Sequence, residues 1–342
     1  MLQLKNNTPL EAKILLMPDP DGIDSLYTII KATFILGEKI SPIEEQIPIV
    51  DEDQYLDEPG QSSLKLPSDL GLIKPGTDVL MLGHAYAPQG WPTTQTDVSL
   101  TIGPLISKTI RVFGDRVWEA GLLGAKISEP QPFEAMPLIW EMAFGGFDQT
   151  NEKEPQIHTE ERNPIGLGFR VKNGNKIMDG MKLPNLEDPV KLISSWKDRP
   201  SPACFGPVCS SWEPRKSYAG TYDEDWQKHR MPYLPKDFDP QFFQLASPDL
   251  VVPGYLKGGE EVQIIGAAPS GQLRFRLPQY QFQVTYQLDN KNHVRSPNLD
   301  TVIIEPDESR LSLLWRTVLP CDKKGLRVSQ VEVALLSGLE ET

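Results

Sequence analysis

Cysteine and histidine are scarce in this sequence, with three cysteines and four histidines among 342 residues. So small and odd a number of cysteines excludes a disulfide framework and suits a reducing compartment. Cys204 and Cys209 are close in sequence, but Cys321 and the dispersed histidines supply no second pair of metal ligands. We therefore predict small buried thiols at Cys204 and Cys209, no metal site, no cofactor and no catalytic residues.

The sequence also lacks long apolar segments and an excess of basic charge. No stretch approaches the roughly 20 apolar residues that cross a bilayer, and MLQLKNNTPLEAK at the N-terminus has no apolar run of signal-peptide length. The formal net charge of −13 argues against a nucleic-acid groove or an anionic membrane surface as the partner. We expect a soluble, cytoplasmic protein that binds neither nucleic acid nor membrane.

The content of proline and glycine excludes long helices. The chain has 32 prolines and 26 glycines, and a proline inside a helix removes a hydrogen-bond donor and clashes with the preceding turn. Coiled coils and helical repeats are therefore incompatible with this composition. Disorder is excluded as well, because a content of 39% hydrophobic and 8% aromatic residues can form a substantial core.

Short runs of β-forming residues occupy both ends of the chain. Leu26–Leu36 is rich in β-branched and aromatic residues, which is typical of a largely buried strand. Apolar and polar residues alternate in Leu273–Leu277 and Phe282–Leu288, so each run buries one face. Similar runs are Val79–Leu82, Val98–Ile102, Ile106–Phe113, Leu311–Leu319 and Val328–Leu335. The pattern predicts an all-β fold, with a sandwich-like arrangement of packed antiparallel sheets.

Residues 151–250 differ from both flanks. They contain twelve of the prolines and three of the seven tryptophans, with little periodicity. Because a linker would not carry so many large aromatic residues, we interpret this segment as an ordered, irregular insertion packed on the sheets. The chain is then a single β-rich domain over residues 1–342, with sub-regions 1–150, 151–250 and 251–342.

A few short helices and one hairpin are expected in the middle segment. Pro189 suits the first position of a helix because its missing donor costs little there. Thr221 and Glu224 have the spacing of a capping box, and Asn173-Gly174 favours a tight hairpin. The expected helices are Asp188–Trp196, Asp225–Arg230 and Pro240–Ala246, and the expected hairpin is Val171–Ile177.

Carboxylates beside tryptophans form one set of candidate functional residues. Glu141 follows Trp140, Glu213 follows Trp212, and a run of acidic residues precedes Trp226. Two carboxylates and an aromatic platform could serve a glycosidase, although carboxylates at a helix start also have a structural use. A carbohydrate-binding or glycoside-hydrolysing β-sandwich is therefore the alternative function. Gly166-Leu167-Gly168 lacks the strand-to-helix context of a phosphate cradle.

Arginines near aromatic residues and prolines form a second set. Trp, Tyr and Arg dominate the energetics of many protein interfaces, because they offer large contact areas and directional hydrogen bonds. The same residues also pin long loops to a domain, so an interface role and a scaffold role both stay open. The candidate partner-binding residues are Arg116, Trp118, Arg162, Trp212, Arg215, Asp223 and Trp226.

Strings of residues along most of the chain resemble a known family. In order and density they are similar to the type VI secretion adaptors that are catalogued as domain of unknown function 2169. The strings are LIKPGTDVLMLGHAYAP (Leu72–Pro88), KTIRVFGDRVW (Lys108–Trp118), PFEAMPLIWEMAFGGFD (Pro132–Asp148), RNPIGLGF (Arg162–Phe169), LPNLEDP (Leu183–Pro189), FGPVCSSWEPRKSYAGTYDEDW (Phe205–Trp226) and LPKDFDPQFFQLA (Leu234–Ala246).

The resemblance implies a non-enzymatic adaptor or chaperone in the cytoplasm of a bacterium. Such a protein holds a toxin effector with a PAAR-like domain and helps to load it onto the VgrG spike. The expected partners are therefore a PAAR-like effector and VgrG. Proline restricts the unfolded chain, and a surface ordered before binding avoids part of the cost of association. Residues 151–250 are thus the leading candidate for a preformed docking surface, with a rigid structural insertion as the alternative.

Overall fold

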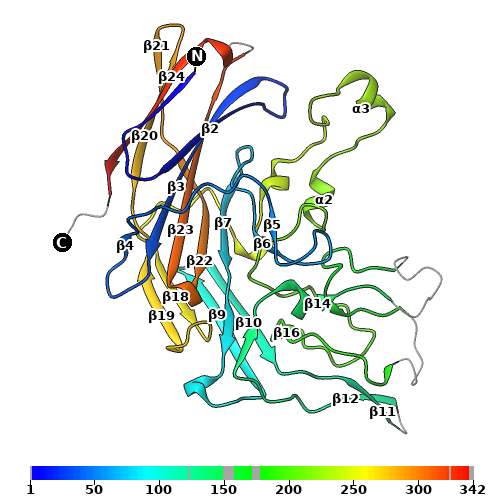
Figure 1. Cartoon of the computed structure of the whole chain (residues 1–342). Helices are drawn as coiled ribbons and strands as arrows, with labels where there is room; N and C mark the ends of the chain where they lie inside the picture. Colours follow the sequence, from blue (N-terminus) through cyan, green and yellow to red (C-terminus); the bar gives the residue numbers. More distant parts are fainter. Residues whose placement is uncertain (1, 122–123, 149–157, 172–177, 323–324, 339–342) are drawn as a thin grey trace.

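The computed structural model describes residues 2–121, 124–148, 158–171, 178–322 and 325–338. Strands dominate these residues, and the predicted all-β, sandwich-like fold is confirmed (Figure 1). The largest sheet has the strand order β17-β7-β22-β23-β3-β2, and β4 pairs with β3 beside this path. Its strands are β2 (Glu11–Pro18), β3 (Asp24–Ile35), β4 (Ser41–Pro42), β7 (Gly76–Met81), β17 (Val251–Pro253), β22 (Asn298–Glu305) and β23 (Arg310–Pro320).

Two further sheets use strands from both ends of the chain. A four-stranded sheet has the order β1-β24-β20-β21, and a five-stranded sheet has the order β16-β10-β9-β18-β19. Their strands are β1 (Gln3–Asn6), β20 (Gln281–Leu288), β21 (Lys291–Arg295) and β24 (Val328–Ser337), then β9 (Gln95–Ile102), β10 (Ile106–Phe113), β16 (Leu186–Glu187), β18 (Glu261–Ile265) and β19 (Gln272–Arg276).

Short elements complete the described chain. The two-stranded pairs are β5 (Gln54–Tyr55) with β6 (Leu64–Leu66), β8 (His84–Tyr86) with β13 (Ala135–Pro137), β11 (Trp118–Gly121) with β12 (Gly124–Ile127), and β14 (Phe144–Gly145) with β15 (Leu167–Gly168). The helices are α2 (Arg215–Tyr218) and α3 (Glu224–His229), and the 3₁₀ turns are η1 (Pro88–Gly90), η2 (Trp140–Met142), η3 (Pro240–Phe243), η4 (Pro248–Leu250), η5 (Pro306–Glu308) and η6 (Gly325–Arg327).

The four-stranded sheet packs on one face of β3 and β23. The Thr28 hydroxyl, on β3, lies 2.8 Å from the hydroxyl of Tyr286 on β20. The Trp315 ring, on β23, meets Phe282 edge to face with centroids 5.0 Å apart. Because the opposite face of β3 is covered too, its residues 25–34 are all buried, which explains the nearly continuous apolar run in the sequence.

The opposite face of the largest sheet carries a buried charge cluster. Arg316 on β23 donates from Nε to Asp300 at 2.6 Å, and a β-bulge at Asp300 interrupts the pairing of β22 with β23. Each of these charges is paired, as burial away from water requires. The charge cluster consists of Lys31 with Asp69, Lys74 with Asp78, and Arg316 with Asp300.

The pairing of strands departs from prediction in one respect. The sheets were expected to be antiparallel, yet β7 pairs with β22 in parallel at the centre of the largest sheet. β1 with β24 and β14 with β15 are parallel as well. Parallel neighbours need a long crossover, and the chain between β7 and β22 includes the whole middle segment, which sequence periodicity does not reveal.

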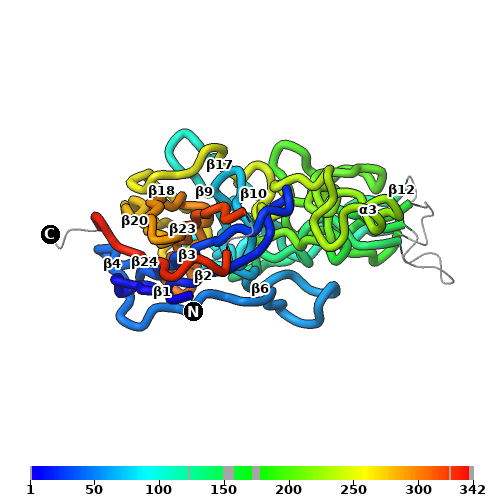
Figure 2. The backbone as a smooth tube through the Cα atoms, turned by 90° about the horizontal axis from the view of Figure 1, so that it is seen from above, coloured from blue at the N-terminus to red at the C-terminus, as the bar shows by residue number. Residues whose placement is uncertain are grey.

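The middle segment projects from one side of the sheets. In both views the strands formed by the two ends of the chain gather on one side, and α3 and β12 lie on the other (Figures 1 and 2). The segment returns to the largest sheet through residues 245 and 246. Their backbone N–H groups donate to the buried carboxylate of Asp78 at 3.0 and 3.1 Å. This carboxylate therefore links β7 to the end of the insertion.

Three local predictions in this segment differ from the structure, and one is untested. No helix forms over Asp188–Trp196, because the carboxylates of Glu187 and Asp198 accept the backbone N–H groups of residues 193, 194 and 195, which a helix would use. The cap of α3 is Asp223 rather than Thr221. The predicted helix Pro240–Ala246 is the shorter η3. The hairpin at Val171–Ile177 falls on residues 172–177, outside the described residues.

Candidate functional site

The segment around α2 is fastened to the interior by tryptophan and arginine side chains. Trp212 is buried and meets Trp140 edge to face, with ring centroids 6.0 Å apart and an interplanar angle of 85°. The Trp140 indole N–H donates to the carbonyl of Pro207 at 2.8 Å. Trp212 therefore holds the start of α2 against η2, which is a scaffold contact.

Arg215 is a buried cation whose partners are carbonyl groups. Nε donates to Phe242 O at 2.9 Å, and Nη1 donates to Val208 O at 2.6 Å. Burial lowers the pKa of the guanidinium, and the charges of Asp78 and Asp53 oppose that shift. Within the described residues, no carboxylate forms an ion pair with Arg215. This side chain thus ties α2 to η3 while its charge lacks a direct counter-ion.

Arg116 and Trp118 are buried, and both contact residues of the middle segment. Arg116 donates from Nη2 to Glu187 at 2.5 Å and to Pro184 O at 2.7 Å. Burial raises the pKa of Glu187, and the charge of Arg116 opposes that rise. Trp118 packs in a small apolar cluster with Met178, Met181 and Leu183. The structure therefore gives both predicted residues structural contacts, and β11, which begins at Trp118, lies well away from α3 (Figure 1).

Arg162 is partly exposed beside a cavity of about 310 Å³. Its guanidinium forms a two-point ion pair with Glu160, at 2.6 and 2.8 Å, and also donates to Pro200 O at 3.1 Å. The hydrogen bonds to Glu160 raise the pKa of the guanidinium. The cavity is also lined by Trp140 and Pro214, so Arg162 and the α2 segment share one stretch of surface.

Asp223 and Trp226 lie in the loop that carries α3. The Asp223 carboxylate caps the helix by accepting from Trp226 N at 2.9 Å, and the Trp226 indole donates to Tyr233 O at 2.8 Å. Exposed apolar side chains surround this tryptophan: Tyr222 is 53% and Met231 59% exposed. We call Tyr222, Trp226, Met231 and Tyr233 the α3 patch. Arg230 ties the loop to the body by donating to Pro20 O.

The structure therefore separates the seven predicted residues into two groups. Four are buried, namely Arg116, Trp118, Trp212 and Arg215. The other three, Arg162, Asp223 and Trp226, are partly or fully exposed. Both groups come from the aromatic and arginine-rich strings, because the same residue types serve as interior anchors and as surface contacts.

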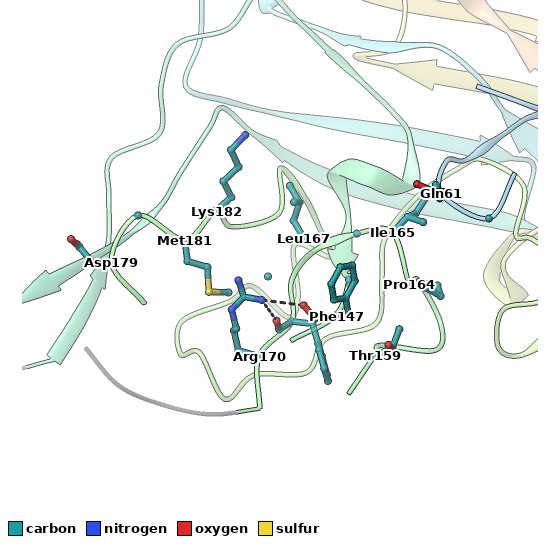
Figure 3. A pocket seen from close by; sticks show the side chains of 17 residues that line it. Gln61, Phe147, Thr159, Pro164, Ile165, Leu167, Arg170, Asp179, Met181 and Lys182 are labelled. Atoms are coloured by element: carbon teal, nitrogen blue, oxygen red, sulfur yellow. Dashed lines mark hydrogen bonds between the residues drawn. The ribbon is translucent and has the colours of Figure 1, made fainter. Parts of the chain in front are cut away.

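A hollow of about 1020 Å³ lies beside β14 and β15 (Figure 3). Arg170 donates there from Nη1 to the backbone oxygens of Phe147 and Phe169, at 3.1 and 3.0 Å. Two glycines that line the hollow allow neighbouring backbone segments to approach closely. A Cβ on Gly145 would lie 2.1 Å from Asn163 O, and a Cβ on Gly166 would lie 2.5 Å from Ala143 O. The glycines of the predicted Gly166–Gly168 motif are thus explained by packing, without a phosphate.

Of the carboxylate and tryptophan pairs, the two at Trp140 and Trp212 lie in the interior, whereas Trp226 and the acidic residues before it lie at the surface. Trp140 and Trp212 are buried against each other, and the Glu141 carboxylate accepts from the backbone N and the hydroxyl of Ser63, at 2.7 and 2.5 Å. Glu213 accepts from the Ser217 hydroxyl at 2.6 Å. These groups are engaged in structural hydrogen bonds, so the sequence feature behind the carbohydrate alternative has a structural explanation at these two pairs.

The predicted buried thiols are present. Cys204 and Cys209 are buried, and burial raises the pKa of their thiols to about 11 and about 12. In the described part of the chain, no three His, Cys, Asp or Glu side chains gather as metal ligands. Nor does any helix in the described ranges have the length and apolar character to cross a membrane.

Sequence reasoning missed Gln244 and the charge cluster. Gln244 is 8% exposed, and its Nε2 atom has no hydrogen-bond partner among the described residues. Nothing in its sequence context, FFQLA, marks it. The charge cluster did leave a signal, because Lys31 and Arg316 each interrupt an apolar strand run. A charge in such a run indicates a buried partner elsewhere in the chain.

A family model described as "Uncharacterized protein conserved in bacteria (DUF2169)" matches residues 21–316. Neither the curated proteins nor the solved structures contain a match to the chain. The matched residues include the largest sheet from the start of β3 to most of β23, together with the whole projecting segment. The chain is therefore a member of this bacterial family, DUF2169.

Proposed function

We propose that this protein is a non-enzymatic adaptor that binds a PAAR-like effector in the cytoplasm and helps to load it onto the VgrG spike of a type VI secretion system. The supporting observation is the placement of the strings that resemble such adaptors. Phe205–Trp226 and Leu234–Ala246 belong to the projecting middle segment, and they are anchored through Trp212, Arg215 and the Asp78 carboxylate.

The α3 patch is the part of this segment that we assign to the effector. It combines exposed aromatic and methionine side chains with the backbone anchors at Asp223 and Arg230. Aromatic residues held in place before binding contribute contact area at low entropic cost. The net charge of −13 would speed the encounter with a basic partner and disfavour an acidic one.

Co-expression with the PAAR-like protein and the VgrG protein encoded in the same genome tests the proposal. We expect a complex that survives affinity purification and size-exclusion chromatography. The double variant Tyr222→Ala/Trp226→Ala should reduce recovery of the effector about tenfold or more, since interface aromatics contribute about 2 kcal/mol or more each. Trp91→Ala, which removes an exposed tryptophan outside the segment, should leave recovery unchanged.

Two results would contradict the proposal, in whole or in part. If neither protein co-purifies with the wild-type chain, and deletion of its gene leaves secretion of the effector intact, the adaptor function is wrong. If the complex forms but tolerates the double variant, the α3 patch is not the contact surface. Arg162→Glu then tests the surface around the neighbouring cavity, where a loss of binding without a change in thermal unfolding would identify an interface residue.

A further inference from the structure

A further cavity, of about 420 Å³, lies between α2, η3 and β17. We call it the Arg215 cavity. Its walls are largely apolar and include Pro214, Tyr218, Pro240 and Pro248, and Arg215 and Gln244 both line it. Pockets of this size with apolar walls and a few polar groups are typical of sites for small ligands or single side chains.

Arg215 and Gln244, two of the polar side chains that line this cavity, have donor groups that no described acceptor uses. Arg215 is 7% exposed and uses Nε and Nη1 on carbonyl groups, while its Nη2 makes no hydrogen bond to any described group. Gln244, equally buried, has an unpartnered Nε2. A buried donor without a partner costs about 1–3 kcal/mol, and among the described residues of this cavity Gln244 Nε2 is such a donor, which an acceptor in the cavity would satisfy.

Within the cavity, the group that favours an anion is the Arg215 guanidinium, with which no described carboxylate forms an ion pair. The charge cluster beside it holds three cations and three carboxylates, which compensate one another. Arg215 adds a further positive charge. Asp239 also lines the cavity and keeps its negative charge; its carboxylate accepts from Gln241 N and Gln241 Nε2, at 2.8 and 3.0 Å, and not from Arg215. The exposed Asp53, near Arg215, accepts from Ser68 N.

We infer that the Arg215 cavity binds a carboxylate carried by an apolar group, with the guanidinium of Arg215 and the amide of Gln244 as donors. A carboxylate supplies one negative charge and two acceptor oxygens, and arginine pairs with it at two points. The backbone on both sides is held before binding, because Arg215 fixes residue 242 and the Asp78 carboxylate fixes residues 245 and 246. This inference does not depend on the proposed adaptor function.

Small probes test the inference without any partner protein. N-acetyl-leucine presents a chain-terminal carboxylate beside an apolar side chain, and N-acetyl-leucinamide is its neutral match. N-acetyl-glutamic acid α-amide presents a side-chain carboxylate. In calorimetric or ligand-detected NMR titrations we expect at least one carboxylate probe to bind and the neutral amide to bind about tenfold more weakly or not at all. The better of the two carboxylates identifies the source as a chain end or an acidic side chain.

Two substitutions at Gln244 test the site in proteins that we expect to fold as the wild type does. Gln244→Met removes the unpartnered donor, breaks no side-chain hydrogen bond of the wild type, and should weaken probe binding about tenfold. Gln244→Glu places a carboxylate in the cavity with Arg215, so it should raise the unfolding temperature and abolish probe binding. Gln227→Glu, on the exposed surface of α3, adds the same charge and should change neither.

The inference is overturned if no carboxylate probe binds the wild-type chain, or if the neutral amide binds equally well. It is also overturned if Gln244→Met binds the probe as the wild type does. The inference also predicts that Gln244→Glu stabilises the protein by placing a carboxylate near Arg215. An unfolding temperature for Gln244→Glu that is lower than that of Gln227→Glu would therefore contradict it.

Discussion

Replacing Trp212 with alanine separates a scaffold role from an interface role at the residue where the two hypotheses differ most. The side chain is buried, and its ring packs edge to face on Trp140 at 6.0 Å. In the scaffold role, the substitution removes a core contact that anchors α2, and partner binding is lost only because the segment around α2 is no longer held in place.

The magnitude follows from the buried area. A tryptophan buries up to about 250 Å², which at about 25 cal/mol per Å² gives about 6 kcal/mol. That is an upper bound, because the unfolded chain already buries part of its apolar surface. Measured aromatic-to-alanine changes in protein cores cost about 3–5 kcal/mol. We therefore expect Trp212→Ala to lower the free energy of unfolding by about 4 kcal/mol.

Urea denaturation followed by far-UV circular dichroism measures the change. With a slope of about 3 kcal/mol per molar urea, the midpoint should fall by more than about 1 M. Trp226→Ala is the matched control: its ring is only partly buried and its indole makes one hydrogen bond, so its loss should cost about 1 kcal/mol. A Trp212→Ala protein that unfolds within about 1 kcal/mol of the wild type, yet no longer binds the effector, would refute the scaffold reasoning.

Three further predictions follow from the interior and the surface charges. Lys31→Met should lower the free energy of unfolding by about 3–5 kcal/mol in urea titrations, because it leaves Asp69 buried without its ion-pair partner, and restoration of stability by adding Asp69→Asn would tie the loss to that charge. All three thiols are buried, and burial raises the pKa of Cys204 to about 11, so Ellman's reagent at pH 8 should label them only after unfolding; rapid labelling of the native protein would contradict their placement. The hydrogen bond from Arg111 holds the pKa of Asp97 below its usual value, so this pair stabilises the fold at neutral pH and loses its effect as the pH falls through the lowered pKa. The difference in unfolding temperature between wild type and Asp97→Asn should therefore be present at pH 7 and vanish in strong acid.

The strands were predictable because their pattern is local. Ile106–Phe113 was expected as a strand and is β10 with the same bounds. The alternation in Phe282–Leu288 places Phe282, Val284 and Tyr286 in the core, as side chains two apart on a strand must share a face. Alternation reports burial directly, so these elements need no knowledge of the rest of the chain.

The helices of the middle segment were harder to predict because side chains compete for the backbone. Asp188-Pro189 looks like a helix start, yet the Asp198 carboxylate takes the N–H groups of Ser194 and Ser195. The competing carboxylate lies after the expected helix, where a search for capping motifs does not look. Proline content predicted irregular structure there, but it did not predict which backbone groups would be bonded.

The candidate site shows the same division between local and long-range information. Composition and strings of residues were enough to establish an all-β chain without long helices and to direct attention to the aromatic and arginine-rich segment. They could not separate Trp212, in the core, from Trp226, at the surface, because both tryptophans have the same types of residue beside them in the sequence. That separation depends on contacts between residues far apart in the chain, such as Trp140 with Trp212 or Arg316 with Asp69. Local pattern determines which strands form, whereas burial, charge pairing and the unmet donors of the Arg215 cavity arise only when distant segments exclude water together.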